Sequence, residues 1–191
     1  MGRAYFRRGV QRGDHRRLRC LHGRECDAES DGEVVRDMKK IALAIVIASG
    51  MAIPAEGIFT TAYKDPVGID TICVGSTAGV KPGDRKSMQE CMALLSKEMG
   101  DAVRAVDTCQ PGLPVGVLAA FSDAAFNIGE YVACDPRRST AAKLLLAKDY
   151  LGACKQLLRW DKAWVLGAFR PLPGLTKRRA RNVEVCMKGL T

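Results

Sequence analysis

An apolar run of 15 residues, from Ile41 to Ala55, places the strongest constraint on how this chain can fold. Met38 and two lysines precede the run, and an acid, Glu56, follows it directly. Such a run has to be buried in a protein core or in a lipid bilayer, and it is shorter than the ~20 residues that usually span one. Its length and its lysines also match the apolar region of a signal peptide, with small residues at 50–52 as a cleavage site.

Cleavage at 50–52 would leave Glu56 close to a frayed N-terminus, with no element to hold its side chain. We therefore expect residues 38–55 to stay uncleaved, to enter the membrane weakly and to leave it again. The released segment would then form the helix that positions Glu56. An ordinary buried core helix remains the alternative, because apolar runs of this length are often found in cores.

After Glu56 the chain first contains turn residues and β-branched residues, and then long stretches in which apolar residues recur at helical spacing. Turn residues surround a β-branched stretch at 71–74, which predicts a small antiparallel sheet with tight turns. A capping-box sequence, Ser87-Met-Gln-Glu90, then opens a helix whose apolar positions continue to Val106. Further helices are predicted over 113–128, 139–146, 150–160 and 175–188.

This order of elements predicts an α+β fold, mostly α, with two lobes. A small antiparallel β-hairpin lobe is followed by a long connecting helix and a helical C-terminal lobe. The segment 56–191 would form the catalytic domain, because a cleft between two lobes is a common place for substrate to bind.

Residues 1–37 differ from the rest of the chain. They hold nine arginines and seven acids among few apolar residues, so no helical or strand period persists. We predict that this segment is disordered, or that it is an extension from too early a start codon, with Met38 as the natural start. A role of its arginines in binding nucleic acid stays open.

The distribution of histidine limits the chemistry of this chain. Both histidines, His15 and His22, precede Met38, and none follows it. Ser-His-Asp hydrolases, Cys-His peptidases and His-ligated zinc amidases all require imidazole. Acid–base catalysis after Met38 would therefore have to rely on carboxylates.

The cysteines and the net charge point to the surroundings of the protein. Six cysteines between residues 73 and 186 lie far apart with no Cys-x-x-Cys pair, which disfavours a metal site. They favour a disulfide framework formed in an oxidising compartment, with buried free thiols as the alternative. The net charge of +9 implies an anionic partner, such as nucleic acid, a membrane surface or a wall polymer.

Two carboxylates and a hydroxyl form the candidate catalytic group. Asp65 lies nine residues after Glu56, and Thr71 lies six residues after Asp65. Hydrolysis of a glycoside requires one carboxyl group that protonates the leaving oxygen. A second carboxylate supports the attacking water or the developing positive charge. Solvated acids in a surface turn would give the same spacing.

This stretch resembles the active-site hairpin of phage-type lysozymes, glycoside hydrolase family 24. That family has a Glu, eight residues, an Asp or Cys, five residues and a Thr, which is the spacing of Glu56, Asp65 and Thr71. The resemblance covers residues 40–190. It continues in order through Ala125-Phe-Asn-Ile-Gly129, Ser139-Thr140, Gly152-Ala-Cys154 with Arg159-Trp160, and Gly174-Leu-Thr-Lys-Arg178-Arg179.

One residue departs from the family pattern. Many relatives carry His or Asn between Gly and Thr in the turn where this chain has Ser76. We expect the Ser76 hydroxyl to support the turn by a local hydrogen bond.

The resemblance implies an endolysin with a lysozyme-like fold. Such a muramidase would hydrolyse the β-1,4 bond between N-acetylmuramic acid and N-acetylglucosamine in peptidoglycan, as a monomer without metal or cofactor. Glu56 would be the general acid. Asp65 would stabilise the developing positive charge or orient the water, and Thr71 would hold that water.

The resemblance also implies supporting residues. Arg179 matches the family's arginine near the catalytic glutamate, so it would hold the Glu56 carboxylate in place. Asn127 would line the cleft, and Tyr63 is assigned with it to substrate binding. The family layout implies three disulfides, Cys73–Cys91, Cys109–Cys134 and Cys154–Cys186.

The apolar segment resembles the signal-anchor-release type found in endolysins of lambdoid phages. These are exported to the host periplasm, tethered inactive to the inner membrane, and activated when the segment leaves the bilayer. Residues 39–55 contain no cysteine, so activation would not need thiol exchange. Peptidoglycan and, transiently, the inner membrane are then the expected partners, and nucleic acid is not.

Two other functions remain open at this point. A lytic transglycosylase cuts the same bond with one glutamate and no water, and the presence of both Asp65 and Thr71 argues against it. A non-enzymatic cationic protein could instead disrupt membranes through its basic C-terminal helix, Leu175–Lys188.

Overall fold

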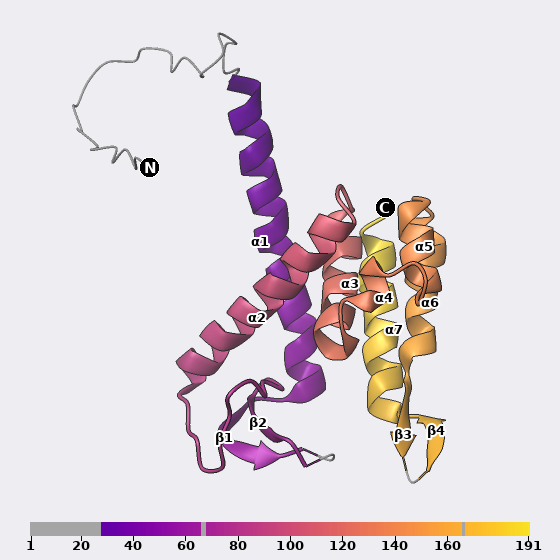
Figure 1. Cartoon of the computed structure of the whole chain (residues 1–191). Coiled ribbons are helices and arrows are strands. Elements are labelled where there is room, and N and C mark those ends of the chain that lie inside the picture. The colour runs from indigo at the N-terminus through magenta and orange to yellow at the C-terminus, as the bar shows by residue number, and fades with distance from the viewer. Residues whose placement is uncertain (1–27, 66–67, 166) are drawn as a thin grey trace, which may run out of the picture. The chain divides into compact units, whose positions relative to one another are not determined.

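The computed structural model describes residues 28–65, 68–165 and 167–191 (Figure 1). The chain divides into two compact units, Met1–Asp37 and Met38–Thr191. Helix α1 (Ala28–Glu56) begins in the first unit and ends in the second. Residues 28–37 are thus helical, and the prediction of disorder is wrong for them, because each residue added to an existing helix gains a backbone hydrogen bond. Residues 1–27 lie outside the described residues.

A short hairpin forms the β lobe of the second unit and confirms the predicted antiparallel sheet. Strand β1 (Phe59–Lys64) pairs with β2 (Asp70–Cys73) so that Tyr63 lies opposite Thr71. The loop between the strands is closed by Asp65, whose backbone N–H donates to the Ile69 carbonyl at 2.9 Å. The hairpin therefore presents Tyr63, Asp65 and Thr71 next to one another.

Two long helices connect the hairpin to the rest of the second unit. Helix α2 (Met88–Cys109) begins with the predicted capping box, in which Ser87 and Glu90 satisfy each other's backbone N–H groups. Helix α3 (Val115–Ile128) is buried from Gly116 to Ala125 and ends at Gly129, where a φ of +101° favours glycine.

The helical lobe follows in chain order, and Figure 1 shows α7 lying beside α3. Its helices are α4 (Tyr131–Cys134), α5 (Thr140–Leu146), α6 (Tyr150–Gln156), the 3-10 helix η1 (Leu157–Trp160) and α7 (Pro173–Lys188). The predicted α+β, mostly helical lysozyme-like fold is confirmed.

Three details of the helical lobe were not expected. The helix expected over 150–160 is divided into α6 and η1, and α4 is a single turn. Strands β3 (Lys162–Val165) and β4 (Ala168–Pro171) form a second hairpin. Its Trp164 and Phe169 side chains are exposed, so it lacks the alternation of buried and exposed residues that marks a strand in a sequence.

Helices α3 and α7 approach each other closely because glycines meet at their contact. A Cβ atom added to Gly116 would lie 2.7 Å from the Gly189 backbone, and one added to Gly189 would lie 2.6 Å from Gly116. Any side chain at either position would force the helices apart. The close approach brings the polar residues of α7 against the buried face of α3.

Helix α1 is buried along only one side in the second unit. Ala44, Ala48, Met51 and Ala52 are at most 4% exposed, whereas Val46 is 68% exposed. By length and composition, the Val34–Glu56 part of α1 is the one described stretch that could cross a membrane, and 22% of its apolar window is buried. An ordinary core helix would be mostly buried, so this exposure disfavours the core-helix alternative.

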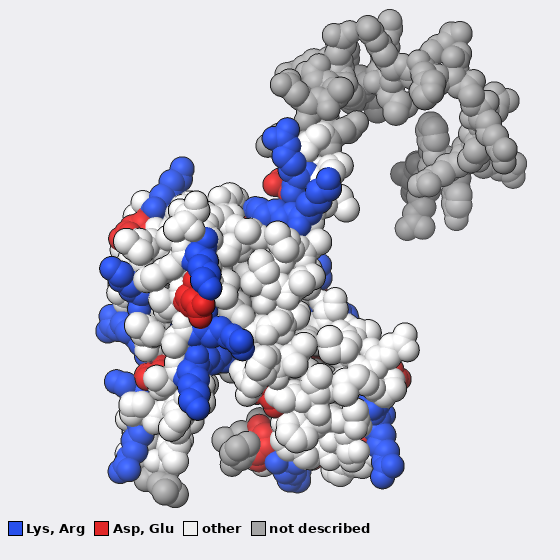
Figure 2. Space-filling view, turned by 180° about the vertical axis from the view of Figure 1, so that it is seen from behind, with Lys and Arg blue, Asp and Glu red and all other residues white. Residues whose placement is uncertain are grey.

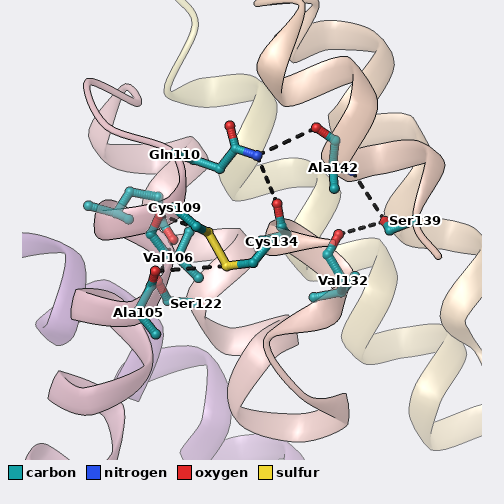
Figure 3. Close-up of a disulfide and its surroundings, with 11 residues drawn as sticks. Ala105, Val106, Cys109, Gln110, Ser122, Val132, Cys134, Ser139 and Ala142 are labelled. Atoms are coloured by element: carbon teal, nitrogen blue, oxygen red, sulfur yellow. Dashed lines mark hydrogen bonds between the residues drawn. A yellow bond between two sulfur atoms is a disulfide. The ribbon is translucent and has the colours of Figure 1, made fainter. Parts of the chain in front are cut away.

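Three disulfides join the elements of the second unit, and they are the pairs that the resemblance implied: Cys73–Cys91, Cys109–Cys134 and Cys154–Cys186. Figure 3 shows the Cys109–Cys134 bridge, which joins the end of α2 to α4. The Gln110 amide beside it donates to the Ala133 carbonyl at 2.9 Å and to Ala142 at 3.5 Å. This bridge therefore fixes α2 to the helical lobe. No cysteine of the described residues is free.

Removal of the Cys109–Cys134 bridge by substitution of both residues with alanine should lower the free energy of unfolding by about 3 kcal/mol, because the bridge closes a loop of 25 residues in the unfolded chain. Denaturant unfolding under oxidising conditions measures this change, with the intact chain as the control. A loss below about 1 kcal/mol would show that the bridge does not constrain the unfolded state as this account requires.

Candidate active site

A cavity of about 700 Å³ lies between the β lobe and helices α2 and α3. Carboxylates, hydroxyls and one amide line it, and few of its residues are strongly apolar. The cavity contains Glu56 of α1, Tyr63, Asp65 and Thr71 of the first hairpin, Ser76, Glu98 and Asp101 of α2, and Phe126 and Asn127 of α3. The structure therefore brings the three predicted catalytic residues together in one cavity.

Glu56 is the last residue of α1, and its side chain is 30% exposed. Its Oε1 atom accepts a charge-assisted hydrogen bond from Nη1 of Arg178. The Asn127 amide also donates to Oε1 at 3.5 Å. The carboxylate is thus held on one side by α7 and α3, and it remains open to the cavity on the other.

The guanidinium that holds Glu56 belongs to Arg178, and the expectation that Arg179 makes this contact is wrong. Successive residues of an α-helix point about 100° apart, and in this structure it is Arg178 whose guanidinium contacts Glu56 directly. Arg179 instead donates to Asn182 at 2.8 Å and to Oδ1 of Asn127. It supports the amide that contacts Glu56.

Arg178 is anchored on its far side by a buried acid. Its Nε and Nη2 atoms donate to the two carboxylate oxygens of Asp123 at 3.1 and 2.8 Å. Burial lowers the pKa of Arg178, but the hydrogen bonds and charge of Asp123, and then those of Glu56, raise it above its usual value. Burial and the charge of Arg178 lower the pKa of Arg179 to about 10, so both guanidiniums are charged at neutral pH.

The first hairpin holds the other two catalytic candidates. The Asp65 carboxylate accepts the Ile69 N–H at 2.8 Å, which fixes the side chain at the end of β1. Thr71 is 3% exposed, and its hydroxyl donates to the Ile69 carbonyl at 3.1 Å. Because that proton is used in the hairpin, the Thr71 oxygen is left to accept a hydrogen bond from a water in the cavity.

Tyr63 lies close enough to both acids to respond to their charge. Burial, followed by the charges of Glu56 and Asp65, raises the pKa of its phenol. The ring of Phe59 packs against it with centroids 4.6 Å apart. The neutral phenol therefore lies at the cavity wall, within the electrostatic influence of both carboxylates.

Ser76 supports its turn and also makes a long-range contact. Its backbone N–H and C=O both bond to Ile72, and its hydroxyl donates to Glu98 of α2 at 2.7 Å. The expected local bond of the hydroxyl is thus replaced by a bond across the cavity wall. No pattern in the sequence pointed to Glu98, because it occupies an ordinary position on an amphipathic helix.

Asp123 was also missed, although the sequence held a signal for it. It is the one charged residue in the apolar stretch 115–128, and a charge on a buried helix requires a partner. Among the described residues, no group of three or more His, Cys, Asp or Glu is placed to hold a metal ion.

Residues 54–182 match the family model of phage lysozyme. The SAR-endolysin of Pseudomonas phage phiKMV is 31% identical over 154 residues, which cover 80% of this chain and 92% of that protein. The SAR-endolysin of Enterobacteria phage P21 is 31% identical over 153 residues, which cover 78% and 88%. The crystal structure of the active form of the P1 phage endolysin Lyz has a TM-score of 0.64 at 26% identity and covers 79% of this chain and 95% of that one.

The similarity therefore extends over the whole cavity, from the end of α1 to the arginines of α7. It confirms the resemblance that the spacing of Glu56, Asp65 and Thr71 first indicated. The chain belongs to the phage lysozyme family.

Proposed function

We propose that this protein is an endolysin that hydrolyses the β-1,4 bond between N-acetylmuramic acid and N-acetylglucosamine of peptidoglycan, with Glu56 as the general acid. The observation that carries the proposal is the position of Glu56. It is held by Arg178 on one side and faces a cavity that also contains Asp65 and Thr71.

In the proposed reaction, protonated Glu56 gives its proton to the glycosidic oxygen as the bond to the anomeric carbon breaks. The Asp65 carboxylate stabilises the positive charge that develops on the sugar ring. Thr71 accepts a hydrogen bond from the water that attacks the anomeric carbon, and the proton that this water loses passes to the Asp65 carboxylate. Tyr63 and Asn127 line the same cavity, and we assign them to positioning of the sugar.

The charge of the surface supports an anionic polymer as substrate. On the face seen in Figure 2, Lys and Arg side chains form several groups toward the edges of the second unit, with a few Asp and Glu side chains beside them. Peptidoglycan carries carboxylates on its peptide groups, so this surface attracts it. The carboxylates of the cavity are then available for the catalytic reaction.

The membrane-disruption alternative fits α7 poorly. Four residues of this helix are buried, and Cys186 ties it to α6. A helix that inserts into a membrane surface has to turn a continuous apolar face outward. In this fold the inward face of α7 carries buried Arg178, Arg179 and Asn182, which act within the protein.

We further propose that residues 39–55 first tether the protein to the inner membrane and that the protein acts in the periplasm as a monomer. Two observations support this proposal. The apolar part of α1 has the length and composition of a membrane span, and its last residue is Glu56. While that segment lies in the bilayer, Glu56 cannot occupy its place beside Arg178.

Substitution of Glu56 with glutamine keeps the size of the side chain but removes its acidic proton. The rate of peptidoglycan hydrolysis should fall by a factor of roughly 10² to 10⁴, the usual contribution of a general acid. Release of reducing ends from purified peptidoglycan measures the rate. The control is Glu184→Gln, which breaks only an exposed pair with Lys188 on α7 and should retain activity.

Two results would contradict the proposal. Wild-type lysis by Glu56→Gln would show that the protein does not act as this enzyme. Products that end in anhydro-muramic acid would replace hydrolysis with the transglycosylase reaction, since that product forms without water.

A chain that starts at Met38 should hydrolyse peptidoglycan at the rate of the full chain, because residues from Met38 onward form a compact unit of their own. The same assay on both purified proteins tests this prediction, and a large loss of activity would contradict it.

N-terminal sequencing of the protein made in a host cell tests the tether. Retention of residues 39–55 is expected, whereas a mature protein that begins near Ile53 would rule the tether out.

A further inference from the structure

Glu56 belongs to a closed ring of hydrogen-bonded side chains contributed by α1, α3 and α7. Arg178 joins Glu56 to Asp123, and Asn182 joins Asp123 to Arg179. Arg179 then contacts Asn127, which returns to Glu56. In order, the ring consists of Glu56, Arg178, Asp123, Asn182, Arg179 and Asn127.

Asp123 is fully enclosed, as are Arg179 and Asn182 of the same ring. It is 0% exposed and accepts three hydrogen bonds, two from Arg178 and one from Asn182 at 2.7 Å. A buried carboxylate is costly unless it is paired, and an apolar residue of similar volume often gives equal or greater stability. Its presence here therefore calls for a role other than stability.

The ring is balanced in charge. It contains two carboxylates, Glu56 and Asp123, and two guanidiniums, Arg178 and Arg179. The Asp123 carboxylate balances part of the positive charge of Arg178, on the side of the guanidinium that faces away from the cavity. Without Asp123, the Nε and Nη2 atoms of Arg178 would lose the carboxylate that fixes them, and the contact of Arg178 with Glu56 would no longer be constrained.

We propose that Asp123 is a positioning residue for hydrolysis, which fixes Arg178 from its far side so that Arg178 holds the Glu56 side chain in place at the cavity. This inference rests on the proposed role of Glu56. Asp123 does not touch substrate and acts only through Arg178. The other groups that face Glu56 are Arg179 and Asn127 within the ring, and Tyr63 of β1, whose phenol is neutral.

The test is Asp123→Asn in the full chain, because asparagine has the same size without the charge. The expected result is a fall in kcat of roughly tenfold to a hundredfold with KM unchanged, since misplacement of a catalytic group lowers the rate of the chemical step.

Ser122→Ala is the matched control for Asp123→Asn. Ser122 is also fully buried on α3, but its hydroxyl bonds only to the Leu118 carbonyl of the same helix. It should leave kcat unchanged. A folded Asp123→Asn protein with wild-type kcat would overturn the inference. If Glu56→Gln is inactive in the same assay, that result leaves the proposed function intact.

A second measurement does not depend on the folding of Asp123→Asn. In the nitrogen-15 NMR spectrum of Glu56→Gln, the Arg178 side chain should keep slow exchange of its Nε–H and hindered rotation of its guanidinium, because Asp123 still holds it. Fast exchange and free rotation of Arg178 in this variant would show that Asp123 does not fix the arginine, and the inference would be wrong.

Discussion

The contact between Glu56 and Arg178 joins residues 122 positions apart, and the rest of the site depends on it. One partner is the last residue of the first helix, and the other lies on the last helix of the chain. Neither helix makes this contact by itself. Asp123 of α3 holds the other side of Arg178, and the close approach of α3 and α7 at Gly116 and Gly189 packs these two helices together.

Arg178 combines two functions that usually conflict. A cation beside an acid orients the carboxylate, but it also stabilises the ionised form. Here the guanidinium is divided between two carboxylates, one fully buried and one at the cavity. The orientation is kept while part of the charge is balanced elsewhere. The disulfides also help to keep this orientation, since they fix α2 and α7 to the elements that surround Glu56 and Arg178.

Much of the fold could be predicted from local signals in the sequence. Ser87 and Glu90 form a helix start whose physical cause lies within four residues, and Gly129 ends a helix for a similarly local reason. The residues Glu56, Asp65 and Thr71 are close in the sequence, so their meeting in one cavity could also be expected. The disulfide pairs required the family resemblance, because spacing alone leaves many pairings open.

The parts that could not be predicted depend on how distant elements meet. Whether Arg178 or Arg179 faces Glu56 is decided by the rotation of α7 about its own axis, which no local pattern reports. Glu98 reaches Ser76 only after α2 has packed against the β lobe. The β3–β4 hairpin was missed for a different reason, since its aromatic side chains point outward and leave no trace of a buried face.

The last residue of α1 is the proposed acid, and only Gly57 and Ile58 separate it from the first strand. An α-helix rises about 1.5 Å per residue, so a displacement of α1 by a single residue moves the Glu56 carboxylate out of reach of Arg178 and Asn127. Under the proposed tether, a molecule whose α1 is only partly seated would then be as inactive as one whose α1 is still in the membrane. The onset of lysis would follow the number of molecules with a seated α1 and not a gradual gain in the activity of each one.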